Sequence, residues 1–306
     1  MTRTVTVGLD GSPESRTAAE WAAREAKLRE LPLKLVHVWE PVPEPIAVVR
    51  LLGPETHQHW TERIPREAAA GLRAAHPEVE LHVEQVTGRP AEVLIDTAKD
   101  AELLVLGSRG LSGAVGFAVG SVGLAVVAHA ERPVVLVRIE AEGRGAGEHP
   151  TEPSHTSDTA SDTTPSRPVV LGLDTTAPDD TLIRFAFEAA LQRGTPLRVI
   201  HAWNEPPYIA YGMLPDLELN AQIAAEQAAA VTSALRPWRQ KFPTVDVVED
   251  SRPGKAANHL VDAAGEASLV VVGRRIRRSP LGAHIGPVTH AVLHHSTAPV
   301  VVVPHD

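Results

Sequence analysis

Cysteine is absent from this chain of 306 residues. Its absence excludes disulfide bonds, thiolate nucleophiles and zinc sites built from cysteine. Aromatic residues are few as well, at 4% of the composition, whereas apolar residues together reach 43%. The length exceeds that of one typical compact core and suits two domains of about 150 residues, each with enough apolar material for a core of its own.

Long apolar runs and an excess of positive charge are also missing. No run of 18 or more uninterrupted apolar residues occurs, and the opening MTRTVTVGLDGSPES lacks the charged-then-apolar layout of a signal peptide. The formal net charge of −9 is opposite to the basic surface that general nucleic-acid binding requires. We therefore expect a cytoplasmic protein that has neither a membrane nor a nucleic acid as its partner.

The sequence repeats itself once. LKLVHVWEP in the first half returns as LRVIHAWNEP in the second, and HAERPVVLV returns as HSTAPVVVV. Asp174 lies 164 residues after Asp10, and Gly273 lies 166 residues after Gly107. This nearly constant offset indicates a duplicated domain. We expect domains at 1–140 and 167–306, joined through 141–166, a flexible linker rich in Ser, Thr, Pro and Gly.

Within the first copy, short apolar runs alternate with longer amphipathic stretches. The pattern predicts strands at 5–9, 33–38, 79–86, 102–106 and 133–138, and helices beginning at Pro13 and spanning 55–75, 91–99 and 121–130. Continuous apolar strands that alternate with helices are typical of parallel sheets covered on both faces. The predicted fold class is α/β, with two tandem doubly wound domains, each a five-stranded parallel sheet with helices on both faces.

One stretch, VLGSRGLSGAVGFAVGS at 105–121, is unusually rich in glycine. Ligands of open α/β sheets bind beyond the carboxyl ends of the strands, where Gly107 and Gly110 are expected to lie. Gly120 and Ser121 would begin the next helix, whose unpaired N–H groups and positive dipole end favour a phosphate. Tight packing is the alternative explanation for these glycines.

Asp10 ends the first predicted strand and would face the same crevice. Its carboxylate would accept a hydrogen bond from a ribose hydroxyl or help to hold Mg²⁺ between phosphates. The glycine spacing matches neither the dinucleotide fingerprint G-x-G-x-x-G nor the P-loop with its Gly-Lys-Ser/Thr ending. A phosphate site of another kind is therefore predicted.

The spacing of two residues between the first pair of glycines and nine before the final Gly-Ser, together with VGLDGS and VVAHAERPVVLVR, resembles the universal stress proteins of the tandem type. The resemblance implies a Rossmann-like, adenine nucleotide alpha-hydrolase-like fold that holds ATP, with Mg²⁺ as its companion, in the first domain. It places the nucleotide-binding roles on Gly8, Asp10, Ser12, Val38, Gly107, Ser108, Arg109, Gly110, Gly120, Ser121 and Val122. It also implies a role in the stress response, an unknown protein partner, and association through the last strands as a homodimer or an intramolecular pseudo-dimer.

The second copy departs from this pattern. Ile276 stands in place of the second glycine, and Pro287 replaces the serine, which removes both a hydroxyl and a backbone N–H. We therefore expect little or no ATP binding there. Four arginines surround Ile276, and they suit an anion ligand, a solvated loop or a surface for an acidic partner: Arg274, Arg275, Arg277 and Arg278.

Two classes of function follow from these patterns. The first is an ATP-binding regulatory protein whose occupancy is read out through conformation or assembly. The second is a slow ATPase or nucleotidyl-transfer enzyme, for which Asp10 and Arg109 are the polar groups near the predicted phosphates; a nucleotide-free scaffold is a third reading. No catalytic or metal-ligating residue is assigned, because the paired histidines lack carboxylates at ligand-like spacing. His37 and His201 recur between the copies and are expected to serve the fold.

Overall fold

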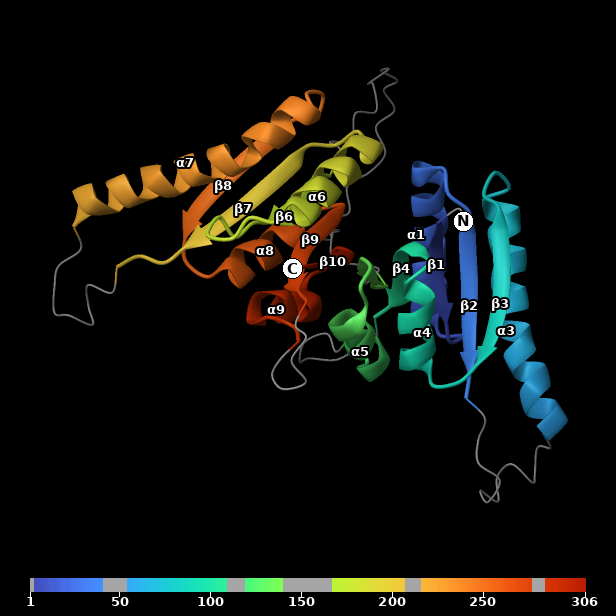
Figure 1. Cartoon of the computed structure of the whole chain (residues 1–306). Helices are drawn as coiled ribbons and strands as arrows, with labels where there is room; N and C mark the ends of the chain where they lie inside the picture. Colours follow the sequence, from blue (N-terminus) through green and yellow to red (C-terminus); the bar gives the residue numbers. More distant parts are fainter. Residues whose placement is uncertain (1–2, 41–53, 109–118, 140–166, 207–215, 277–283) are drawn as a thin grey trace, which may run out of the picture.

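The computed structural model describes residues 3–40, 54–108, 119–139, 167–206, 216–276 and 284–306, with the backbone alone for 54–62 (Figure 1). The predicted linker 141–166 lies outside these residues. The elements of the first half are β1 (Thr4–Leu9), α1 (Pro13–Arg29), β2 (Leu33–Trp39), α3 (Pro54–Ala75), β3 (Leu81–Thr87), α4 (Pro90–Ala98), β4 (Ala101–Gly107), α5 (Ser121–His129) and β5 (Val134–Val137). Those of the second half are β6 (Val169–Gly172), α6 (Asp180–Arg193), β7 (Leu197–Trp203), α7 (Leu217–Lys241), β8 (Val247–Pro253), α8 (Ala256–Ala264), β9 (Leu269–Arg275), α9 (Pro287–His295) and β10 (Val300–His305).

All described strands belong to one sheet, in the order β3-β2-β1-β4-β5-β10-β9-β6-β7-β8. Within each half the neighbouring strands are parallel. The predicted pair of doubly wound, five-stranded domains is confirmed, and the bounds of the predicted strands and helices agree with the structure to within two residues.

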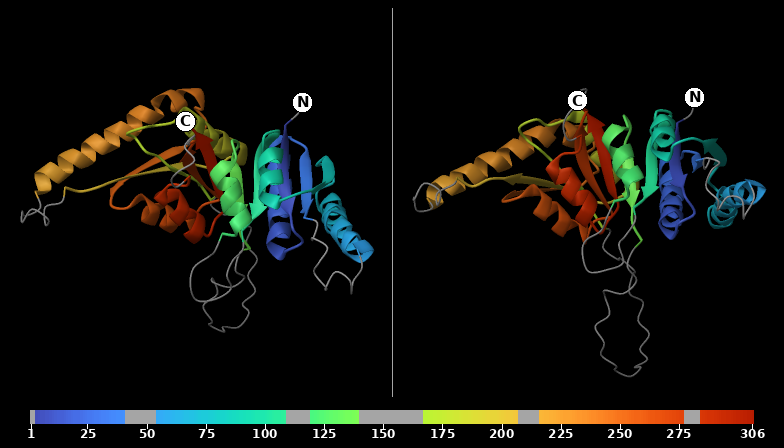
Figure 2. Two further views of the ribbon diagram at one scale, coloured as in Figure 1. Left: turned by 60° about the horizontal axis from the view of Figure 1, so that its bottom comes forward. Right: turned by 90° about the horizontal axis from the view of Figure 1, so that it is seen from below.

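The two sheets meet along a seam between the last strand of each half. Strands β5 and β10 run antiparallel, with Val300 opposite Leu136 and Val302 opposite Val134. Both strands are buried apart from the end of β10. Each apolar strand covers an edge of the other half that would otherwise expose unpaired backbone groups. The halves thus pair within one chain, and Figure 2 shows the seam from two further sides.

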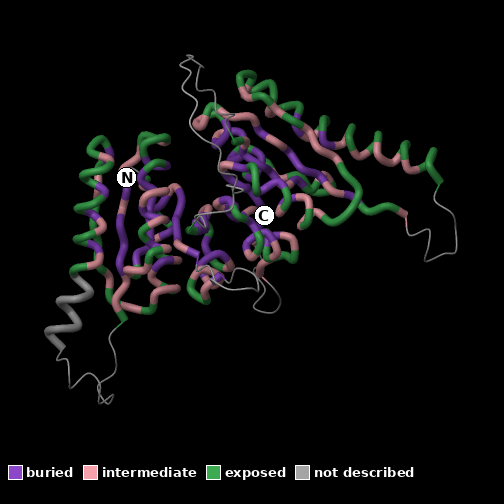
Figure 3. Tube along the Cα trace, turned by 180° about the vertical axis from the view of Figure 1, so that it is seen from behind, coloured by how far each residue is buried: buried purple, intermediate pink, exposed green. Residues whose placement is uncertain are grey.

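Helices cover the continuous sheet in two layers. One core lies under α1, α3, α6 and α7 and contains side chains from both halves, among them Leu35 and Phe187. The core on the opposite face lies under α4, α5, α8 and α9, with Val126 and Leu293 as examples. Figure 3 shows the buried strands between helices whose outer faces are exposed. None of the described helices carries an apolar stretch long enough to cross a bilayer.

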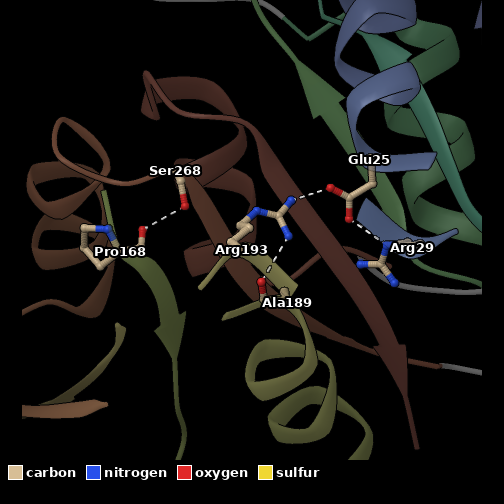
Figure 4. Close-up of polar contacts among 6 residues, drawn as sticks. All are labelled: Glu25, Arg29, Pro168, Ala189, Arg193 and Ser268. Carbon is tan, nitrogen blue, oxygen red and sulfur yellow. Dashed lines mark hydrogen bonds and ion pairs between the residues drawn. The ribbon is translucent and has the colours of Figure 1, made fainter. Parts of the chain in front are cut away.

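A buried ion cluster joins α1 to α6 across the seam (Figure 4). The carboxylate of Glu25, only 2% exposed, accepts from Arg29 Nε at 2.6 Å and from Arg193 Nη2 at 2.5 Å. The Arg29 guanidinium also lies 5.2 Å from the ring centroid of Phe185. A buried carboxylate requires such partners because desolvation alone would be costly. The cluster therefore ties the orientation of one half to that of the other.

Candidate functional site

The first half contains a cavity of about 330 Å³ at the carboxyl ends of β1, β2 and β4. Eight of the sequence-predicted site residues line it: Gly8, Asp10, Ser12, Val38, Gly107, Gly120, Ser121 and Val122. These residues come from separate parts of the chain, and the parallel strand order brings them together. The predicted site residues Arg109 and Gly110 lie outside the described residues.

Ser108 is placed differently from the prediction. It is 1% exposed, and both its backbone N–H and its hydroxyl donate to the carbonyl of Val137, at 2.8 and 3.3 Å. The side chain therefore ties the end of β4 to β5 and is not among the residues that line the cavity. Sequence position alone could not show which side of the strand end this hydroxyl occupies.

Asp10 is held in a tight turn at the end of β1. Its Oδ1 accepts from the backbone N–H of Ser12 at 3.0 Å and from the Ser12 hydroxyl at 2.5 Å. The same Ser12 oxygen accepts from the N–H of Ser15 at 3.1 Å and so caps α1, as its position before Pro13 predicts. Ser12 thus both orients Asp10 and caps the start of α1.

The two motif glycines that line the cavity have different neighbours. A Cβ on Gly107 would lie 2.6 Å from the backbone carbon of Glu14, so this glycine admits the start of α1 against β4. A Cβ on Gly120 would meet no described heavy atom within 4 Å. The φ and ψ of Gly120, −64° and 156°, suit any residue. Packing therefore explains Gly107, whereas no described residue occupies the space beside Gly120 at the start of α5.

The start of α5 supplies hydrogen-bond donors to the cavity. In a helix the first N–H groups have no intrahelical acceptor, and here they belong to Ser121, Val122 and Gly123, all of which line the cavity. The N-cap Gly120 has no side chain that could satisfy them. These N–H groups and the positive end of the helix dipole form an arrangement suited to a phosphate or another anion.

The charged residues among those that line the described wall of this cavity are both acidic, Asp10 and Glu14. Carboxylate oxygens are preferred ligands of Mg²⁺, which commonly bridges a protein carboxylate to nucleotide phosphates. Glu14 was missed by the sequence analysis, although an acidic residue in the first turn of a helix after β1 was a usable signal. Within the described residues, no group of three or more His, Asp or Glu side chains could hold a metal ion by itself.

His37 lies between Val36 and Val38, both of which line the cavity. Its ring is buried, and Nδ1–H donates to the carbonyl of Leu9 at 2.8 Å, joining the end of β2 to that of β1. His201 makes the matching bond to Leu173 at 3.0 Å in the second half. The expected role of both histidines in the fold accords with this geometry.

The second half has its own cavity, of about 510 Å³, at the matching strand ends. There Asp174 repeats the turn of Asp10, because its Oδ1 accepts from the N–H and hydroxyl of Thr176 at 3.0 and 2.6 Å. The hydroxyl bond is the main reason that the pKa of Asp174 is lowered, and Arg275, whose Nη2 lies 3.8 Å from Oδ2, adds to it. The predicted cations Arg277 and Arg278 lie outside the described residues.

Gly273, the glycine of β9, lies against the side chain of His305. A Cβ on Gly273 would lie 2.6 Å from Nε2 of His305, and the Nδ1 of that histidine lies 3.6 Å from Oδ2 of Asp179. Gly286 is as open as Gly120, but the helix after it begins at Pro287, which carries no N–H. The second cavity therefore offers one donor fewer at the start of its helix.

Comparison with known proteins agrees with this architecture. The universal stress protein Rv2623 of Mycobacterium tuberculosis is 31% identical over 306 residues, which span 97% of this chain and 95% of that protein. A crystal structure of a universal stress protein from Archaeoglobus fulgidus covers 99% of this chain and 98% of its own, with a TM-score of 0.69 and 16% identity, and so shares the fold. A universal stress protein solved in complex with cAMP matches 44% of this chain at a TM-score of 0.35, too slight a likeness to identify a ligand here.

The sequence pattern of one family matches both halves separately. The universal stress protein family is matched at residues 1–138 and again at 165–304, which together leave out little more than the predicted linker. The duplicated sequence, the paired sheets and the curated relative of nearly equal length agree with this result. The chain therefore belongs to the universal stress protein family.

Proposed function

We propose that the first half of the chain binds an adenine nucleotide, ATP, with its phosphates at the start of α5. The observation that carries the proposal is the open space beside Gly120, next to the first N–H groups of α5. No described atom packs against this position, and the backbone conformation there suits any residue. A ligand that must approach the start of the helix closely would explain why this position is a glycine.

The other residues of the cavity have complementary roles in this proposal. The N–H groups of Ser121, Val122 and Gly123 would donate to phosphate oxygens. Asp10 and Glu14 would hold Mg²⁺ against the phosphates, or Asp10 would accept from the ribose, and Val38 would contact the base. Bound Mg²⁺ would offset the negative charge of both carboxylates and nucleotide.

Binding with a regulatory outcome fits the described wall better than rapid turnover does. Efficient phosphoryl transfer needs a group that positions the water and a cation that stabilises the transferring phosphoryl. Among the described residues the wall holds two acidic residues and no cation, while the predicted cation Arg109 lies outside the described residues. We propose that occupancy acts through conformation or assembly and that any hydrolysis is slow.

The test is the nucleotide content of the purified chain, compared with Gly120→Glu and with Gly286→Glu as the matched control. Neither glycine has a described atom within 4 Å of where its Cβ would lie, so both variants are expected to fold, as circular dichroism can verify. We expect one ATP per chain in the parent and in Gly286→Glu, and loss of ATP in Gly120→Glu because the new carboxylate repels phosphate. Loss in Gly286→Glu alone, or no nucleotide even after incubation with Mg-ATP, would contradict the proposal.

A further inference from the structure

The C-terminal end of α5 is held by the second half of the chain. Arg274, the penultimate residue of β9, is 5% exposed, and its Nη2 donates to the carbonyl of Ala130, which caps α5. The ring of His284 lies with its centroid 5.0 Å from that of His129, the last residue of α5. Both Arg274 and His284 line the second cavity. Helix α5 thus begins at the first cavity and ends against residues of the second.

Helix α5 depends on such contacts because its own sequence favours helix weakly. It has nine residues, SVGLAVVAH, a length at which isolated helices are marginal in water. Gly123 and three valines lower its helix propensity further. Its last carbonyls have no intrahelical donor and carry the negative end of the dipole, where a cation is favourable. The guanidinium of Arg274 supplies a cation at this end, where it donates to the carbonyl of the cap residue Ala130 at a buried position.

The reverse contact provides an internal comparison. Arg138, just after β5, donates from Nη2 to the carbonyl of Leu293 in α9. Burial lowers the pKa of Arg138 to about 10, which leaves it cationic at neutral pH. Each half therefore sends one buried arginine to a helix of the other half. Of the two helices, α9 begins with Pro287, and α5 begins with the accessible N–H groups.

We infer that Arg274 is a positioning residue for the nucleotide site of the first half, acting through α5. The inference rests on the proposed function. Without the guanidinium, the last turn of α5 would fray. Nucleotide binding would then have to order the helix, and the entropy cost of ordering would reduce the free energy of binding. The second half, although it departs from the phosphate motif, would in this way prepare the helix that binds the phosphate.

The experiment compares Arg274→Ala, Arg274→Lys and Arg138→Ala in the full chain by calorimetric titration with Mg-ATP. We expect Arg274→Ala to weaken binding about fivefold. Arg274→Lys should restore most of the affinity, because an ammonium can also donate to the carbonyl, and Arg138→Ala should leave it unchanged. An equal loss in Arg138→Ala would show general loosening of the seam and overturn the inference, as would unchanged affinity in Arg274→Ala.

Hydrogen exchange of the α5 amides without nucleotide separates failure of this inference from failure of the proposed function. Faster exchange in Arg274→Ala than in Arg138→Ala would support the link between the halves. If α5 exchanged faster and the parent chain bound no nucleotide, the proposed ligand would be wrong while the link remained. Unchanged exchange in α5 would overturn the link itself.

Discussion

The two halves of this chain share a fold and differ in what their glycines accommodate. In the first half Gly107 admits the start of α1, and in the second half the matching Gly273 admits the ring of His305. Neither Gly120 nor Gly286 has a described atom within 4 Å of where its Cβ would lie, yet only the first is followed by a residue with a backbone N–H. The role of a motif glycine thus depends on the atoms that a side chain at that position would contact. The sequence motif does not show which atoms these are.

The largest effect is expected on nucleotide affinity, when two residues of the second half are replaced by their counterparts from the first. Ile276→Gly combined with Pro287→Ser restores the glycine, the hydroxyl and the N–H at the start of α9. We expect Mg-ATP affinity of the second cavity to rise by about tenfold or more, since helix N-terminal donors are recovered. Calorimetric stoichiometry would measure the gain.

Ile276→Gly alone is the control for that exchange, because Pro287 still withholds its N–H. This single variant should bind the same number of ATP molecules per chain as the parent. A double variant without added binding would show that His305 and the arginines, rather than Pro287, set the two cavities apart.

An intermediate effect is expected on the free energy of unfolding when alanine replaces each of two motif glycines of the first half, Gly107 and Gly120. Gly107→Ala forces a methyl against the backbone of Glu14, which should lower the free energy of unfolding by about 1–3 kcal/mol. Gly120→Ala meets no described atom, so its cost should be limited to weaker N-capping, about 0.5 kcal/mol. Urea unfolding measures both. Equal destabilisation would refute the distinction between a packing glycine and an access glycine.

The smallest effect is a pH dependence confined to α9. Burial, and then His294 and His295, lower the pKa of His290 from its ordinary value of 6.5. The unfolded chain therefore binds the proton more readily, so this contribution to stability is full above pH 6.5 and is lost as the pH falls toward the lower folded pKa. Because His290 is exposed, the loss should be a few tenths of a kcal/mol.

Leu124 occupies the position of His290 in the first half, so His290→Leu is the matched substitution. It should flatten the stability profile between neutral and mildly acidic pH. A parent chain whose unfolding free energy rises on acidification through this window would contradict the assigned sign.

Much of the candidate site was readable from sequence because its residues sit at strand ends and helix starts. Asp10 and Gly120 follow from the alternation of strands and helices together with the carboxyl-end rule, whereas Val38 follows from the resemblance to the universal stress proteins. Glu14 was missed because its approach to the cavity depends on how α1 packs on β4. That Ser108 is not among the residues that line the cavity depends on packing too, since its hydroxyl donates to the neighbouring strand β5.

The sequence by itself determined the duplication, the alternating elements and the cap of α1, because local periodicity and capping residues act within a few positions. It also located the missing N–H of Pro287, a covalent property. Only the tertiary structure decided that the last strands, β5 and β10, pair within one chain and that Arg274 reaches the cap of α5. Those contacts join residues far apart in the chain, and their partners depend on how whole sheets and helices pack rather than on any local pattern.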